Sequence, residues 1–445
     1  RQSPTQKRPP VNFQTDSERA RLKHIRMRPA MAHKAVDAAY GAPLLSATEI
    51  IQATRLPRPP KPSVAVLPFA AGDTEQRWLG IALAESLTIL LSYLPQLFVA
   101  DSNSAASMAS MGLLRQEIAE RLGVRYTIDG RIMNPRDKLR ISVSLVDNDT
   151  GEQVWGEVFR AVADGTDDLE QKITNQIAPQ IWSKVDLSER RQGLRRLGIG
   201  SSLYERWWQA SALFRGFDKK GVQDALKLAS NLADENPNCP FSTSLAAFLN
   251  GLSHLLGHTP DDGVAKARAN HLCSAALRCG PDNVEALGYC IATQLMIGGD
   301  LELAESLVVR ALSILPSYQP PLFWGGWVDV VAGRPERARE RLELALRINP
   351  VTGVRGPTLC AIGFSLLQNL AWDDAYQILS EAQKSDPDFP LTYPGLLAAA
   401  AALGKEAEAA ALRELLKGSA QLRFVDLFQL PAHREIFTRA LHMAT

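Results

Sequence analysis

Alternating apolar and polar residues predict a compact α/β region in the first half of the chain. The apolar run Ser63–Phe69 follows a proline-rich stretch and is too short for a helix, so it predicts a buried strand. Two segments in which polar and apolar residues alternate, 125–133 and 138–146, predict a hairpin, because an Asn-Pro-Arg-Asp turn separates them. A further strand is expected over 153–161.

Helical patterns lie between and after these strands. Leucines that recur every three or four residues predict an amphipathic helix over 75–94, followed by a short strand at 97–100. The serine-rich stretch 101–110 is expected to be a bare connector, and a ligand-binding loop is the alternative, because loops at the carboxyl ends of strands often bind ligands. Helices are expected over 113–122 and 168–191, which gives the order β-α-β-α-β-β-β-α.

Beyond this region the pattern changes to helix pairs that end at regularly placed prolines. The prolines recur at intervals of 34 to 44 residues, and a tetratricopeptide unit has about 34 residues with such a proline after its second helix. Small residues recur within the units, where two helices cross too closely for larger side chains. The sequence therefore predicts five to six helix pairs. The closing prolines are Pro237, Pro281, Pro316, Pro350 and Pro387.

Three blocks of the α/β region carry a family resemblance. They are SVAVLPF at 63–69, EIAERLGVRYTIDGRI at 117–132 and LRISVSLVDNDTGEQVWGEVF at 139–159. In order and spacing they resemble the TolB amino-terminal-like domain. The resemblance implies a bacterial regulator in which this domain lies between an output domain and tetratricopeptide repeats, the output being a class III nucleotide cyclase or a winged-helix DNA-binding domain.

The expected fold class is therefore a small mixed α/β, TolB-like domain followed by an α-solenoid of tetratricopeptide-type helix pairs. The expected boundaries are 1–62 for a basic proline-rich tether, 63–192 for the α/β domain, and 193–445 for the solenoid with its C-terminal capping helix. No sequence pattern of an output domain is recognised.

Composition changes this picture little. The chain has 445 residues, of which 46% are hydrophobic and 22% charged, and its net charge of +1 does not indicate a general nucleic-acid or membrane binder. Residues 1–60 carry eleven Lys and Arg against four Asp and Glu, so this arm is either a solvated linker or a contact for nucleic acid or acidic lipid.

Cysteines and apolar runs bear on the compartment. The five cysteines form no CxxC pair, and we interpret them as buried small hydrophobes in a reducing compartment. No apolar run is long enough for a transmembrane helix, and no signal peptide is recognised. Cytoplasmic localisation is expected, and periplasmic localisation is the alternative if an upstream leader or membrane span is missing.

Motifs that would indicate catalysis are not found. The sequence has no GxSxG, HExxH or Walker pattern, so no catalytic, metal or cofactor-binding residue is expected. The acidic residues Asp147, Asp149 and Glu152 are interpreted as a solvated turn, and a metal site is the alternative. For His254 and His258, surface or cap positions are favoured over zinc ligands, because glycine and proline interrupt the helix beside them.

The repeats supply the candidate partner-binding residues, which are Trp324, Trp327, Tyr289 and Arg334. The two tryptophans lie three apart on the first helix of a unit, and first helices line the inner groove of such solenoids, so either tryptophan could anchor a partner. The alternatives are that both tryptophans belong to the core and that Arg334 belongs to a solvated arginine face.

The sequence thus predicts a non-enzymatic sensory or scaffolding module of a bacterial signal-transduction or transcriptional regulator. The repeats are expected to bind a protein partner or to self-associate, and the α/β domain to bind a small-molecule effector. The alternatives are a transcription regulator that binds nucleic acid through residues 1–60 and the regulatory part of a nucleotide cyclase.

Overall fold

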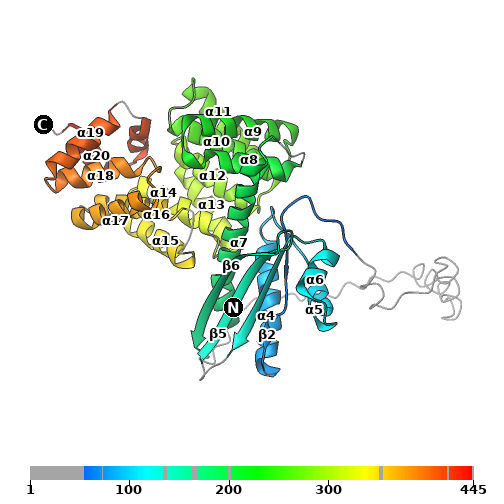
Figure 1. Cartoon of the computed structure of the whole chain (residues 1–445). Helices are drawn as coiled ribbons and strands as arrows, with labels where there is room; N and C mark the ends of the chain where they lie inside the picture. Colours follow the sequence, from blue (N-terminus) through cyan, green and yellow to red (C-terminus); the bar gives the residue numbers. More distant parts are fainter. Residues whose placement is uncertain are drawn as a thin grey trace, which may run out of the picture. The chain divides into compact units, whose positions relative to one another are not determined.

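The computed structural model combines a mixed sheet with a long array of helices (Figure 1). It describes residues 55–72, 74–133, 138–162, 169–198, 202–349, 354–417 and 420–442. Most of the predicted tether, including the basic residues up to residue 54, lies outside the described residues. The predicted fold class, an α/β region followed by paired helices, is confirmed.

A six-stranded sheet forms the α/β region. Its strands are β1 Ser63–Val66, β2 Ala70–Ala71, β3 Phe98–Val99, β4 Tyr126–Met133, β5 Lys138–Asp147 and β6 Glu152–Val162. The strand order is β3-β1-β4-β5-β6, and β2 pairs with β4. β1 is parallel to β3 and β4, whereas β4, β5 and β6 are antiparallel neighbours, as the alternating segments predict.

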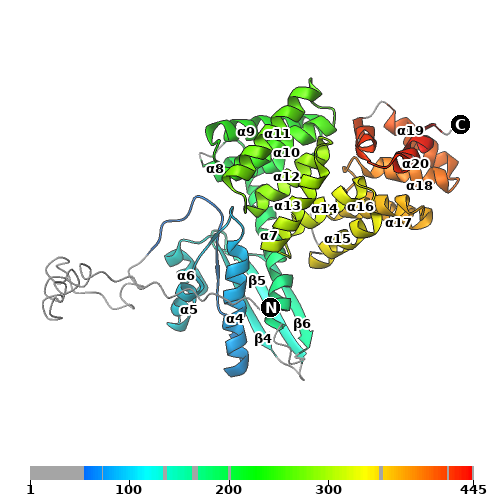
Figure 2. The same cartoon turned by 180° about the vertical axis from the view of Figure 1, so that it is seen from behind.

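Side-chain alternation on β5 explains which face of the sheet is covered. Ile141, Val143 and Leu145 are buried, and the serines between them are half-buried on the opposite face. The apolar face packs against α4 (Thr74–Ser92) and α7 (Leu169–Arg195), which also contact each other. Figure 2 shows α4 in front of the strands and α7 continuing from the sheet toward the repeats.

The serine-rich stretch after β3 is a helix, so the expectation of a bare connector is wrong. Helix α5 (Ser102–Ser110) begins after Asp101, whose carboxylate accepts a hydrogen bond from the Ser104 backbone N–H at 2.9 Å. Ala105 and Met108 are buried on its inner face. An N-terminal cap and two well-placed apolar residues are enough here, although serine has only modest helix propensity.

Six helix pairs follow within the described part of residues 203–416. Their helices are α8 Leu203–Leu213, α9 Lys219–Glu235, α10 Pro240–Leu255, α11 Asp262–Cys279, α12 Val284–Met296, α13 Leu301–Ile314, α14 Gln319–Val331, α15 Pro335–Ile348, α16 Arg355–Gln368, α17 Trp372–Ser385, α18 Thr392–Ala402 and α19 Glu406–Leu416. A 3₁₀ turn, η2 (Phe214–Gly216), joins the first pair. Pro237, Pro281, Pro316 and Pro387 each lie two positions beyond a second helix, as the repeat pattern predicts.

Small residues allow the paired helices to pack close together. A Cβ atom at Gly326 in α14 would lie 2.5 Å from Cγ of Leu342 in α15. In the next pair, a Cβ atom at Gly363 would meet Leu379 Cγ at the same distance. Both leucines are fully buried, so neither can move aside into solvent.

We expect Gly326→Ala to lower the free energy of unfolding by about 1–3 kcal/mol, because the added methyl group overpacks the contact between α14 and α15. Urea denaturation of the full chain measures this change. Gly72→Ala is the matched control, since a Cβ atom there has no atom within 4 Å, and it should change stability by less than about 0.5 kcal/mol. Equal effects of the two substitutions would contradict the close crossing.

The C-terminal segment packs back against the repeats. It consists of the 3₁₀ segment η3 (Ala420–Leu427) and helix α20 (Pro431–His442), and η3 contacts α10 and α12. Phe424 packs edge-on against Trp327, with 5.0 Å between ring centroids. Arg423 pairs with Asp262 at 2.9 Å, so this segment is fixed by both apolar and ionic contacts.

Candidate functional site

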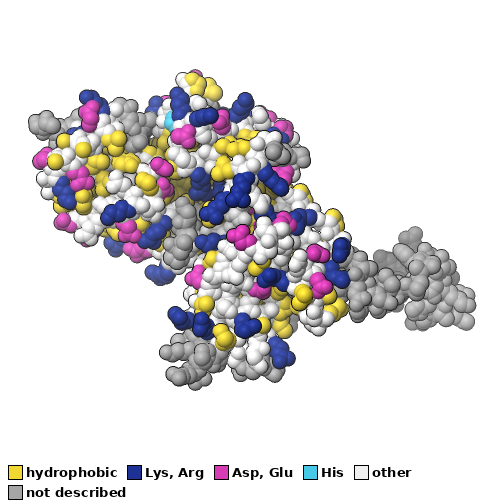
Figure 3. Space-filling model, in the orientation of Figure 1, with side chains coloured by type: hydrophobic (Ala, Val, Ile, Leu, Met, Phe, Trp, Pro, Cys, Tyr) yellow, Lys and Arg dark blue, Asp and Glu magenta, His cyan; other side chains and the backbone are white. Residues whose placement is uncertain are grey.

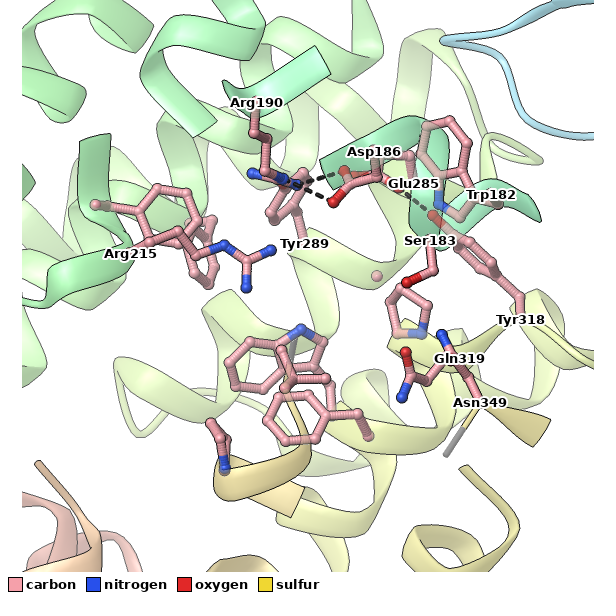
Figure 4. A pocket seen from close by; sticks show the side chains of 18 of the residues that line it. Trp182, Ser183, Asp186, Arg190, Arg215, Glu285, Tyr289, Tyr318, Gln319 and Asn349 are labelled. Atoms are coloured by element: carbon pink, nitrogen blue, oxygen red, sulfur yellow. Dashed lines mark hydrogen bonds and ion pairs between the residues drawn. The ribbon is translucent and has the colours of Figure 1, made fainter. Parts of the chain in front are cut away.

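A cavity of about 460 Å³ lies where the C-terminal half of α7 meets the helix pairs. Its walls come from the end of α4, from α7, from η2 and from the first helices α10, α12 and α14 (Figure 4). The wall is predominantly apolar. Its aromatic members are Trp182, Phe214, Phe217, Phe248, Tyr289, Tyr318, Phe323, Trp324, Trp327, Phe389 and Phe424.

Arg190 is a cationic wall residue whose donors are already engaged. Its Nε and Nη2 atoms each donate to Asp186 at 2.8 Å, one helical turn earlier on α7, and Nη1 donates to the Ser211 carbonyl at 2.7 Å. The guanidinium also lies over the Trp208 ring, 5.4 Å from its centroid. Burial alone would lower the pKa of Arg190, but the Asp186 carboxylate raises it by more. The bidentate pair orients the Arg190 guanidinium, and its contacts with Ser211 and Trp208 fix α7 against α8.

Glu285 is the acidic residue that faces the cavity from α12. It is buried, and its Oε2 atom accepts hydrogen bonds from the Tyr318 hydroxyl and from Gln96 Nε2, the latter at 3.0 Å. Gln96 lies just before β3, so this contact joins the sheet to α12 and α14. Burial raises the pKa of Glu285, and the two donated hydrogen bonds oppose that rise only in part.

We expect the stability of the chain to depend on pH through Glu285. Its pKa is raised in the folded chain above the ordinary value of about 4.5, so its stabilising contribution is complete below that value and is lost as pH rises through the folded pKa. Glu285→Gln should therefore gain stability relative to wild type over the pH range above the ordinary glutamate pKa of about 4.5. Urea unfolding across this range tests the sign. Glu302→Gln, at an exposed position on α13, is the control, and its free energy of unfolding should differ from that of wild type by the same amount at every pH. The same result for Glu285→Gln would contradict the assignment.

Arg215 is a cavity cation that has no carboxylate partner among the described residues. It lies in η2, and Figure 4 shows its guanidinium extending into the open centre of the cavity. Its nearest aromatic contact is Phe214, whose ring centroid lies 5.8 Å from its Cζ atom. No hydrogen bond or ion pair of Arg215 is formed with any residue that the structure describes. Arg215 therefore presents free donors to whatever enters the cavity.

The structure brings three of the four predicted partner-binding residues to this cavity. Tyr289 is buried on α12, and Trp324 is half-buried on α14, where it packs edge-on against Phe248 at 5.9 Å. Trp327 also lines the cavity but is only 1% exposed and packs against Phe364 and other rings. These three residues meet because α12 and α14 are successive first helices.

Arg334 lies apart from the cavity, at the start of α15. Its Nε atom donates to Asp329 Oδ1 at 2.7 Å. Arg341 and Arg337 also bind Asp329, whose side chain is fully buried, and Arg341 extends the cluster to Glu305 at 2.8 Å. The arginines predicted as a solvated face thus include an ionic cluster that joins α13, α14 and α15.

Sequence reasoning missed the charged residues of the cavity, among them Asp186, Arg190, Arg215 and Glu285. They come from α7, η2 and α12, and no local motif links them. One signal was available, because Glu285 is the single charged residue of the otherwise apolar or uncharged helix Val284–Met296. A lone carboxylate in such a helix points to a buried polar contact.

A second polar cluster joins the sheet to α7. Arg125, beside β4, donates to Asp147 at 2.6 Å and to Glu189 on α7 at 2.8 Å. The Tyr126 hydroxyl donates to the same Glu189 at 2.7 Å, and Arg125 also donates to Gln192 at 2.6 Å. Arg125 and both carboxylates are buried. We call these five residues the α7 joint.

Three of the candidate metal ligands, Asp147, Asp149 and His254, have other partners. Asp147 belongs to the α7 joint, and Asp149 pairs with Arg58 at 2.7 Å. His254 contacts Asp262 at 2.9 Å, beside Arg423. Within the described ranges, no group of three or more His, Cys, Asp or Glu residues is placed to hold a metal ion.

A more open hollow of about 580 Å³ lies over the polar face of the sheet. It is lined by residues from β4 and β5 such as Asp129, Arg131 and Ser144. Among the described residues, no helix has both the length and the apolar character needed to cross a membrane.

The fold is that of a TolB amino-terminal-like α/β region followed by tetratricopeptide-like helical repeats, as the sequence predicts. No protein-family model matches the chain. A protein of Rhizobium meliloti (strain 1021), provisionally named adenylate cyclase 3, is 24% identical over 209 residues. The match covers 46% of this chain and 36% of that protein, so the chain matches only about a third of the relative's length.

Two solved structures resemble parts of the fold. TolB from Acinetobacter baumannii is 13% identical with a TM-score of 0.22, and the match covers 29% of each chain. A tetratricopeptide repeat protein from Parabacteroides merdae ATCC 43184 is 14% identical with a TM-score of 0.33, and the match covers 54% of this chain and 100% of that one. These likenesses bear on the fold alone.

Proposed function

We propose that the chain is a non-enzymatic sensory and scaffolding module of a bacterial regulator. One observation carries this proposal. A single helix, α7, is fixed to the sheet by the α7 joint and also forms one wall of the apolar cavity, while the helix pairs form the other walls. A change in the cavity therefore acts on the same helix that orients the sheet.

The repeats supply the scaffolding part of the proposal. Helical repeats present extended surfaces, and their usual role is to bind another chain. Trp324 and Tyr289 remain candidate contacts, because both reach the cavity from first helices. Trp327 is covered by the chain's own Phe424, so a partner would reach it only after displacing η3.

The regulatory part of a nucleotide cyclase is the second candidate, and the match to the Rhizobium meliloti protein favours it. That protein is named as a cyclase, and only 36% of its length is matched by this chain. Under this second candidate, the output is a catalytic domain outside the part of the cyclase that this chain matches, and the chain controls that domain through α7. Both candidates give the chain itself a binding role.

A turnover assay tests the non-enzymatic role. The purified full chain is incubated with ATP or GTP and Mg²⁺ or Mn²⁺, and cyclic nucleotide and diphosphate are measured by chromatography. We expect no product above the buffer level. The contrary result is product that forms with wild type and Glu302→Gln but not with Glu285→Gln. That result would show that the cavity is an active site and would overturn the proposal.

A further inference from the structure

We propose that the cavity between α7 and the repeats binds an amphipathic carboxylate, with the apolar body against the aromatic wall and the carboxylate on Arg215. This inference names the effector class of the proposed sensor and rests on that function for its biological role. The binding itself rests on the geometry of the cavity.

The wall selects an apolar body. A cavity of about 460 Å³ falls in the range typical of small-molecule sites, which are mostly hydrophobic with a few polar groups. The wall is built from leucines of α4 and α10 together with aromatic rings from α7, α10 and α14. Trp182 and Trp324 come from opposite sides of the interface, so an apolar ligand would contact both α7 and the repeats.

The charges around the cavity select an anion. Its lining includes four cations, Lys184, Arg190, Arg191 and Arg215, against two carboxylates, Asp186 and Glu285. Figure 3 shows Lys and Arg side chains gathered where α7 meets the helix pairs. Because Arg190 is neutralised by Asp186, the remaining balance around the cavity is positive.

Arg215 is the group best placed to bind the anion. The donors of Arg190 are taken by Asp186 and by the Ser211 carbonyl, whereas Arg215 has no hydrogen-bond partner within the described part of the chain. A guanidinium presents two parallel N–H donors that match the oxygens of a carboxylate. Tyr289, which lines the same cavity, has a hydroxyl without a hydrogen-bond partner among the described residues and can donate to the same head group.

A cationic ligand fits this cavity less well. The only lining carboxylate without a cationic partner is Glu285, which already accepts hydrogen bonds from Tyr318 and Gln96. Burial also raises the pKa of Glu285 and so favours its neutral form. The free hydrogen-bond donor, Arg215, is therefore positively charged, and the Glu285 carboxylate already accepts two hydrogen bonds.

Binding of matched probes to the full chain tests the proposal. Decanoate, decanol and decylamine share one apolar chain and differ in the head group. Isothermal titration below the critical micelle concentration should show one decanoate per chain. Decylamine should bind about tenfold or more weakly than decanoate, since it meets Arg215 with a like charge.

Substitution of Arg215 separates the head-group contact from the apolar contact. Arg215→Met should weaken decanoate binding by about tenfold or more and leave decanol binding unchanged, whereas Arg215→Lys should retain part of the preference for decanoate. Arg206→Met, which removes the half-buried partner of the exposed Glu235, is the matched control and should behave as wild type. Circular dichroism checks that each variant is folded.

Three results would overturn the proposal. They are the absence of decanoate binding, equal binding of decanoate and decylamine to wild type, and an unchanged affinity for decanoate in folded Arg215→Met. Because binding is measured directly and not through a regulatory output, a failure of the sensory role would leave a positive binding result intact. Loss of binding would leave the scaffolding role of the repeats untouched.

Discussion

Replacing Trp327 with alanine is expected to lower the free energy of unfolding by about 3–5 kcal/mol. The side chain is 1% exposed, and its ring packs edge-on against Phe364 at 5.5 Å and against Phe424 at 5.0 Å. Removing it leaves a void between α14, α16 and η3 that these packed rings cannot fill by small shifts. Urea denaturation of the full chain, followed by circular dichroism, measures the loss.

Trp78→Ala is the matched control for this prediction. Trp78 lies on the outer face of α4 with 68% of its surface exposed, and its removal should change stability by less than about 0.5 kcal/mol. If Trp327→Ala cost no more than Trp78→Ala, Trp327 would not be a core residue. It would then return as a candidate partner anchor.

Replacing Arg125 with alanine is expected to cost about 3–5 kcal/mol, because it leaves two buried carboxylates without their cation. Arg125 binds Asp147 at 2.6 Å and Glu189 at 2.8 Å, and all three side chains are buried. Burial raises the pKa of Glu189, and Arg125 opposes that rise. Without Arg125 the Glu189 pKa rises further, so the loss of stability should be larger near pH 7 than near pH 5.

Arg58→Ala is the control for the Arg125 prediction. Arg58 pairs with Asp149 at 2.7 Å at the surface, where an ion pair contributes about 0–1 kcal/mol. Hydrogen exchange adds a second readout, since Arg125→Ala should speed exchange along Val185–Gly193 of α7. A loss of stability that is equal for both variants, or independent of pH, would contradict the role of the α7 joint.

Local patterns account for much of the fold. The alternation in β4 and β5 predicts the hairpin, because one face of these strands is buried. The regularly placed prolines and the recurring small residues predict helix pairs, because both reflect how neighbouring helices end and cross. Helix α5 was missed, since its start depends on the single cap Asp101 and its apolar face on Ala105 and Met108.

The cavity could be predicted only in part. The sequence predicts Tyr289, Trp324 and Trp327 as partner contacts, the two tryptophans because they lie on a first helix, and the structure places all three at one cavity. The sequence does not indicate Arg215, because no motif surrounds it. Its importance comes from its lack of a hydrogen-bond or ion-pair partner among the described residues. Such information depends on contacts between segments far apart in the chain, and a single sequence does not contain it.

The α7 joint shows the same limit. The sequence places Asp147 in an acidic turn, but its partner Arg125 lies just before β4 and Glu189 lies on the distant helix α7. The charge pattern alone left a metal site as an alternative. The arrangement of the three side chains instead identifies an ionic link between the sheet and α7.

Native mass spectrometry of the full chain, purified gently from its own host, tests the central claim that this chain works by binding. We predict a stoichiometric second protein chain, a bound small molecule released as a carboxylate on denaturation, or both. A chain that emerges alone and monomeric, with an empty cavity, would contradict the proposed sensory and scaffolding role.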